Sequence, residues 1–102
     1  MDEGLKVDIV RTIKDDWLSI ADIEYLVRHR TGSSEDLLAK AVAAATELVS
    51  AGAIVPGELK NGFKPWPDPP EAAVRKIRTA ARELAERGEG TPPGAICWFD
   101  VP

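Results

Sequence analysis

Few residues in this sequence of 102 have side chains suited to catalysis, and those few lie far apart. His29 is the only histidine and Cys97 the only cysteine, so a nucleophile paired with an imidazole base would need these two. His29 stands at the end of a short amphipathic segment, and Cys97 stands between Ile96 and Trp98. The context of Cys97 is typical of a small, buried apolar side chain. The pair therefore predicts no nucleophilic site.

The carboxylates also predict no catalytic or metal-binding site. Asp15 and Asp16, with Asp22 or Glu24, could gather into an acidic cluster, but they lack the alternating spacing of a calcium-binding loop. No glycine pattern is typical of a phosphate-binding loop. We therefore expect no enzymatic activity, no metal and no cofactor, and look for function in a binding surface.

Composition indicates a soluble globular domain spanning residues 1–102, with 44% apolar and 29% charged residues. The net charge of −4 disfavours a protein whose main task is to neutralise phosphates. A single cysteine rules out an internal disulfide, the apolar runs are too short to cross a membrane, and no signal peptide is evident. We expect a cytoplasmic location.

Residues 33–66 organise the rest of the chain. Ser33 is a suitable helix N-cap, and Asp36 follows three residues later, where its carboxylate can reach the N–H of the cap. Gly52 predicts the end of this helix. Apolar residues spaced by three and four form one face: Leu37, Leu38, Ala41, Val42, Ala45, Leu48 and Val49.

A β-hairpin is predicted directly after this helix. Residues 53–55 favour a strand, and Pro56 and Gly57 indicate a bend or an edge position. Asn61 and Gly62 are the strongest short signal for a hairpin turn.

Two helices are predicted before residue 33. The first covers residues 5–17, and the second begins at Ser19, with Asp22 three residues later, and ends before Gly32. The first apolar stripe is Leu5, Ile9, Ile13 and Trp17. The tight connection at residues 31–34 is what a helix-turn-helix requires.

A fourth helix is predicted over residues 68–88, with Asp68 as N-cap, Pro69 at the first helical position and Glu71 at the third. Its buried stripe is Ala73, Val74, Ile77, Ala81 and Leu84. Its other side carries Arg75, Arg78 and Arg82, and the spacing predicts the ion pairs Glu71 to Arg75, Arg82 to Glu86 and Glu83 to Arg87.

Residues 95–101 predict a last strand, with Ile96 and Trp98 on one side and Cys97 and Phe99 on the other. Because both sides are apolar, we expect this strand to be covered, most simply as a third strand beside the hairpin.

The order helix, helix, tight turn, helix, hairpin over residues 5–66 resembles a winged helix-turn-helix domain. The resemblance implies an α+β fold, here extended by a bracing helix at residues 68–88 and a terminal strand at residues 95–101. It rests on architecture and on no diagnostic motif, so it implies little about function.

In winged-helix proteins the third helix enters the major groove of DNA and the wing touches the backbone. The resemblance would make Ser34, Glu35, Lys40 and Ala44 face bases, place Lys60, Asn61 and Lys64 on the wing, and leave Arg28 and Arg30 for phosphates. The third helix departs from this pattern, because its charged residues are Glu35, Asp36, Glu47 and a single lysine. Four phosphate contacts, from Arg28, Arg30, Lys60 and Lys64, would support only weak, salt-sensitive binding unless the protein formed a homodimer.

The other hypothesis is a protein-binding module. Its candidate contacts are the aromatic residues Phe63, Trp66 and Trp98 and the arginines Arg75, Arg78 and Arg82, of which the aromatic residues could equally form core. A small acidic protein suits a larger, basic partner, as with antitoxins, immunity proteins and phage-encoded accessory proteins. We favour protein binding and keep DNA binding as the alternative.

The C-terminal half also resembles a group of small actinobacterial proteins. The residues concerned are Gly57, Glu58, Leu59, Gly62, Phe63, Pro65, Trp66, Gly94, Ala95, Ile96, Trp98, Phe99 and Asp100. This resemblance groups the sequence and implies no activity.

Overall fold

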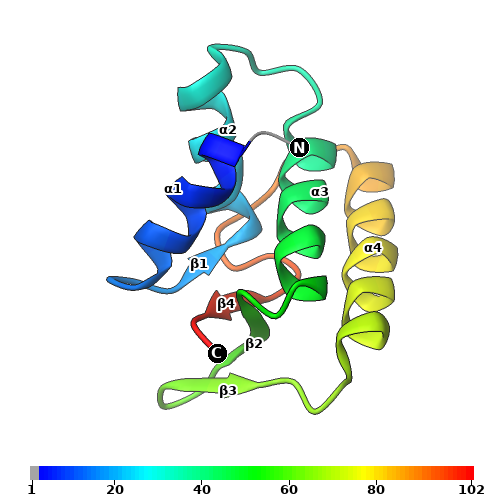
Figure 1. Ribbon diagram of the computed structural model, residues 1–102. Helices are drawn as coiled ribbons and strands as arrows, with labels where there is room; N and C mark the ends of the chain where they lie inside the picture. The colour runs from blue at the N-terminus through cyan, green and yellow to red at the C-terminus, as the bar shows by residue number, and fades with distance from the viewer. Residues whose placement is uncertain (1–2) are drawn as a thin grey trace.

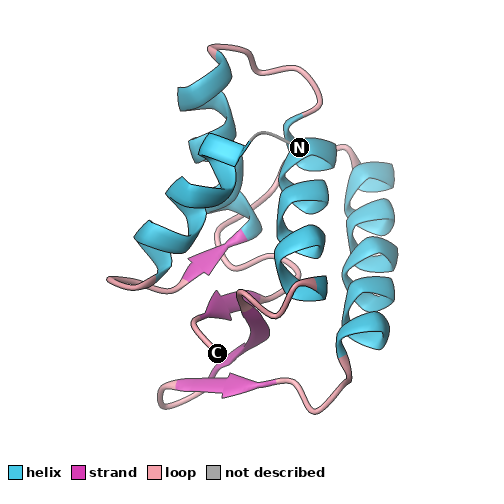
Figure 2. Cartoon of the chain, in the orientation of Figure 1, coloured by secondary structure: helices cyan, strands magenta, loops and turns pink. Residues whose placement is uncertain are grey.

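The computed structural model describes residues 3–102, and in this part of the chain four helices stand over a four-stranded antiparallel sheet (Figure 1). Helices and strands are segregated into two layers, which gives an α+β fold (Figure 2). The elements in chain order are α1 (Glu3–Ile13), β1 (Leu18–Ser19), α2 (Ile20–Thr31), α3 (Leu37–Ser50), β2 (Val55–Leu59), β3 (Phe63–Pro65), α4 (Pro70–Arg87) and β4 (Trp98–Asp100).

The sheet has the strand order β1-β4-β2-β3. The last strand pairs with β2, as predicted, with Gly57 opposite Trp98. It also pairs with β1, where Leu18 lies opposite Phe99. Strand β1 was not predicted from the sequence, and its pairing makes β4 an interior strand of the sheet.

The first helix is shorter than predicted. Helix α1 ends at Ile13, and the N–H groups of Asp15 and Asp16 donate to the carbonyl of Thr12 in a turn. Trp17 was predicted to continue the buried stripe, but it is 38% exposed, and its Nε1 donates to Asp100 Oδ2 at 3.1 Å. The chain has to leave the helix here because β1 must extend along β4.

The second helix is confirmed. The backbone N–H of Ser19 donates to Asp22 Oδ2 at 2.7 Å, and the Ser19 hydroxyl lies 3.1 Å from the same oxygen. Gly32 closes the helix in the left-handed conformation with φ of 69°, and its N–H donates to the carbonyl of Arg28.

The start of the third helix was predicted wrongly. Helix α3 begins at Leu37 with Asp36 as N-cap at a φ of 53°, and the Ser33 hydroxyl instead accepts a hydrogen bond from the Glu35 N–H at 3.1 Å. Ser33 thus stabilises a local turn, an alternative that serine side chains offer the backbone.

The predicted hairpin turn at Asn61 and Gly62 is confirmed, since both have positive φ and Leu59 pairs with Phe63. Pro56 and Gly57, predicted at a bend or an edge, lie inside β2 between β3 and β4. The nitrogen and the carbonyl of one strand residue point to the same side. The Pro56 carbonyl accepts from the Trp66 N–H at the end of β3, so the Pro56 nitrogen, which has no hydrogen to donate, also faces the end of β3 and is tolerated there.

The fourth helix begins at Pro70 with Pro69 as N-cap, so Asp68 is not the cap. The Asp68 carboxylate instead accepts a hydrogen bond from Lys76 at 3.3 Å. The predicted buried stripe is confirmed, as is the end of the helix at Gly88.

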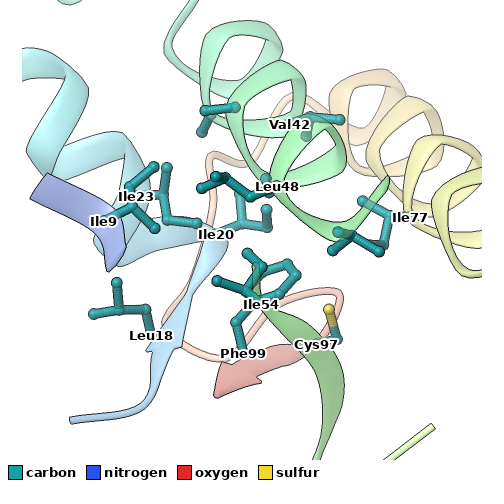
Figure 3. Packing of buried hydrophobic residues seen from close by; sticks show 14 of the residues in the cluster. Ile9, Leu18, Ile20, Ile23, Val42, Leu48, Ile54, Ile77, Cys97 and Phe99 are labelled. Atoms are coloured by element: carbon teal, nitrogen blue, oxygen red, sulfur yellow. The ribbon is translucent and has the colours of Figure 1, made fainter. Parts of the chain in front are cut away.

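The core lies between the sheet and the four helices. Figure 3 shows Ile54 and Phe99 at its centre, with Leu18 to one side and Ile77 and Cys97 to the other. Cys97 is 1% exposed, which confirms its prediction as a core residue. Burial, with Glu58 adding to it, raises the pKa of the Cys97 thiol to about 12.

Candidate partner-binding groove

An open groove of about 760 Å³ lies between α3 and α4, and we call it the α3–α4 groove. The two helices run antiparallel side by side, so the start of α3 lies beside the end of α4 (Figure 1). Residues from both helices, from α2 and from the loop after α4 line it: Glu24, Asp36, Leu37, Leu38, Ala39, Val42, Ala43, Thr46, Arg78, Ala81, Arg82, Leu84, Ala85, Gly88, Gly90 and Thr91.

The groove is hollow because small side chains face it from both helices. Ala39 and Ala43 are spaced by four residues on α3, and Ala81 and Ala85 are spaced by four on α4. Side chains four residues apart lie one above the other on a helix, so each pair leaves a continuous channel. Ala39, Ala43 and Ala85 are exposed in it.

Larger apolar side chains border this channel. Val42 and Leu84 are buried, whereas Leu37 and Leu38 are half-buried and pack against the edge of the core. The leucines at the start of α3 therefore keep apolar surface in contact with solvent inside the groove.

Charge is distributed unevenly along the groove. Arg78 and Arg82 line it from α4, and within residues 3–102 neither makes an ion pair. Asp36, the N-cap of α3, lines the end of the groove where α3 begins and α4 ends, and Glu24 contributes a carboxylate from α2. One oxygen of Glu24 accepts a hydrogen bond from the Thr91 hydroxyl at 2.9 Å.

Within residues 3–102, none of the ion pairs predicted along α4 forms. The one ion pair that α4 makes in this range joins Lys76 to Asp68. Exposed pairs at this spacing are worth a few tenths of a kcal/mol, too little to fix long side chains. Arg75, Arg78 and Arg82 are all exposed, but only the last two line the groove.

The aromatic candidates lie elsewhere, against the sheet and the start of α4. Phe63, Trp66 and Trp98 are each half-buried, and none lines the groove. The Trp66 Nε1 donates to Glu58 Oε1 at 3.2 Å, and the Lys76 ammonium lies 3.9 Å from the centroid of its ring. The structure thus separates the aromatic residues from Arg78 and Arg82.

The residues expected to contact DNA are mostly exposed, but they lie on distant elements. Ser34, Glu35, Lys40, Lys60, Asn61, Lys64, Arg28 and Arg30 are exposed. The end of α2 and the start of α3 lie at one end of the molecule, and the β2–β3 turn lies at the other (Figure 1). Ala44, expected to face bases, is 0% exposed, because α3 is buried around most of its circumference.

Two of the cationic positions near α1 and α3 are engaged within the chain. Arg30 pairs with Asp8 at 3.1 Å, and Lys6 pairs with Glu47 on the exposed side of α3 at 2.8 Å. The hydrogen bond from Lys6 lowers the pKa of Glu47.

Sequence reasoning missed an exposed aromatic pair on α2. Tyr25 is 58% exposed and stacks on His29, with ring centroids 6.2 Å apart, while Arg28 lies 6.0 Å from the Tyr25 ring. The signal was available, because Tyr25 is out of phase with the apolar stripe of Ile23 and Val27.

No protein-family model, no curated protein and no solved structure matches this chain. Over residues 3–102, no three His, Cys, Asp or Glu side chains are grouped so that they could hold a metal ion. The same residues include no helix with the length and apolarity needed to cross a membrane.

Proposed function

We propose that this chain is a non-enzymatic protein-binding module with a winged-helix-like frame, and that the α3–α4 groove is its binding surface. The observation that carries the proposal is an apolar channel open to solvent, bordered by two arginines that have no ion-pair partner within residues 3–102. Concave apolar surface with a few polar groups at its rim is a common feature of binding sites.

The order of elements supports this frame. Helices α1, α2 and α3 precede the β2–β3 hairpin, and the connection from α2 to α3 is short. In this frame α4 and β4 are additions, and α4 supplies one wall of the groove. The addition thus creates a surface that three helices and a hairpin alone would not have.

A protein fits the groove better than DNA does. Its lining is mainly apolar, whereas DNA-binding surfaces are strongly cationic. The exposed side of α3 carries Lys40 and the paired Glu47, and the whole chain has a net charge of −4. We therefore place partner proteins first, of the kind that antitoxins, immunity proteins and phage accessory proteins bind.

Site-specific photo-crosslinking in the native host tests the proposal. A benzophenone amino acid is placed at Ala43 or Ala85, both exposed in the groove, and at Thr79 as the control, which is exposed on α4 outside the groove. We expect one protein to be crosslinked from positions 43 and 85 and not from position 79. Absence of a protein adduct at both groove positions would refute the proposal.

The DNA alternative is tested in parallel by fluorescence anisotropy with duplex DNA at physiological salt. Binding that is lost on Lys60→Glu or Lys64→Glu would assign the function to DNA instead. We expect no binding under these conditions, because the exposed cations lie on separate elements and the chain carries a net charge of −4.

A further inference from the structure

We infer that the occupant of the α3–α4 groove is an amphipathic helix of a partner protein, aligned parallel to α3, with carboxylates in its C-terminal half. The inference rests on the proposed function and specifies the chemistry and direction of the partner segment.

The length of the groove sets the length of the segment. The lining extends from Asp36 to Thr46 on α3 and from Arg78 to Gly88 on α4. Each stretch is about ten residues of helix, or roughly 15 Å. A bound helix would therefore engage the groove over about three turns, with apolar anchors at positions i, i+3 or i+4, and i+7.

The alanines set the size of the anchors. Ala39 and Ala43 on one wall and Ala85 on the other leave space that a small side chain would not fill. Large side chains pack best opposite small ones, so Leu, Ile, Met or Phe are the expected anchors. The half-buried Leu37 and Leu38 would complete their burial against the same segment.

Charge sets the direction. The dipoles of α3 and α4 oppose each other because the helices are antiparallel, so side chains dominate the field in the groove. Arg78 and Arg82 favour the negative C-terminal end of a bound helix, and Asp36, at the opposite end, favours the positive N-terminal end. Arg78 and Arg82 are four residues apart, so carboxylates one turn apart would match them.

A second copy of this chain offers no suitable helix. The large hydrophobic residues that are exposed in the described part of the chain are Val7, Trp17, Tyr25 and Val101. They lie on α1, α2 and two segments outside helices, so no described helix presents a second apolar stripe. The occupant is therefore a different protein.

Selection from a displayed library of randomised 14-residue helical peptides tests the inference. The targets are the wild-type protein, the double variant Arg78→Glu/Arg82→Glu, and Ala43→Glu, which blocks the channel at an exposed position. With the wild type we expect apolar residues at helical spacing followed by Asp or Glu toward the C-terminus. The arginine double variant should select Lys or Arg at those positions, and Ala43→Glu should lose the enrichment.

For a selected peptide, we expect the arginine double variant to raise the dissociation constant at least tenfold, and circular dichroism to show that every variant is folded. Ala85→Glu replaces Ala43→Glu if the latter does not fold. Three outcomes would overturn the inference: extended or proline-rich peptides, acidic residues confined to the N-terminal half, or a wild-type dimer that Ala43→Glu dissociates in sedimentation. Crosslinking in the host tests separately whether a protein occupies the groove. If crosslinking succeeds and the peptide selection fails, the proposed function stands and only the inference of a bound helix is rejected.

Discussion

The tip of the Phe63 ring occupies the space that a side chain at position 57 would need, and Gly57 leaves that space open. A methyl group there would come 2.7 Å from Phe63 Cζ and would also collide with the backbone carbonyl of Lys64. Gly57 pairs with Pro65 on one side and with Trp98 on the other, so the backbone cannot move away on either side.

Gly57→Ala should therefore destabilise the fold by about 2 kcal/mol or more, since overpacking a site with rigid neighbours costs 1–3 kcal/mol. Urea unfolding followed by tryptophan fluorescence measures the loss. Gly4→Ala is the matched control, because a methyl group there meets only the flexible end of Arg30 and alanine favours a helix. Equal stability of the two variants would contradict the packing described for Gly57.

Ile96 has a positive φ of 73°, and the Cys97 N–H donates across it to the carbonyl of Ala95 at 2.9 Å. This tight γ-turn is strained for a β-branched residue. Both Ile96→Gly and Ile96→Ala lose the side chain, but glycine removes the strain, so the glycine variant should be the more stable by about 1 kcal/mol. Thermal unfolding compares the two, and Val10 in α1 serves as control, where alanine should be better than glycine.

Two acidic residues predicted at helix starts, Asp22 three residues after its cap and Asp68 as a cap, differ in the structure and should differ in their contribution to stability. Asp22 accepts from the N–H of Ser19, whereas Asp68 caps no helix and pairs with the exposed Lys76. Asp22→Ala should cost about 1 kcal/mol, the usual value of a lost cap, and Asp68→Ala a few tenths. Chemical unfolding of both variants provides the comparison, and a larger loss for Asp68→Ala would contradict it.

Cys97 should be inert in the folded protein. Its thiol is buried, and burial raises its pKa to about 12 from an ordinary value of 9.0. We expect labelling by a disulfide reagent at pH 8 to be about a thousandfold slower than in the unfolded chain, because it needs an opening of the core. A Ser50→Cys variant in a Cys97→Ala background, with an exposed thiol, should react at the rate of free cysteine.

The same pKa fixes the sign of a pH effect. Below about pH 9 the thiol is protonated in both states, so the contribution of Cys97 to stability is constant. Between about 9 and 12 the thiolate forms in the unfolded chain first, so the free energy of unfolding should fall as pH rises. Cys97→Val should remove this part of the pH dependence, and an unchanged profile would show that other groups cause it.

Periodicity and turn chemistry predicted the helices and the hairpin well. The stripe of α4, the turn at Asn61 and Gly62 and the N-cap of α2 at Ser19 each follow from local signals. Caps at Ser33 and Asp68 failed because several nearby residues could serve as caps, and small differences in turn geometry decide among them.

Strand β1 and the α3–α4 groove depend on contacts between distant segments. Strand β1 has only two residues, too few to show a hydrophobic periodicity, and Leu18 is extended only because it pairs with Phe99. In α3, Ala44 and Ala45 are buried while Ala43 is exposed in the groove, and the residue type is the same in all three. The position of α4 decides which alanines remain open, and no pattern in the sequence specifies that position.

Strand β4 joins β1 to β2, although it is the last of the four to be synthesised. During translation β1 and the β2–β3 hairpin stay unpaired with each other until residues 98–100 leave the ribosome. The sheet can therefore be completed only after these residues have emerged, and its pairing closes large loops. Such non-local contacts favour slow folding relative to a helical protein of this size.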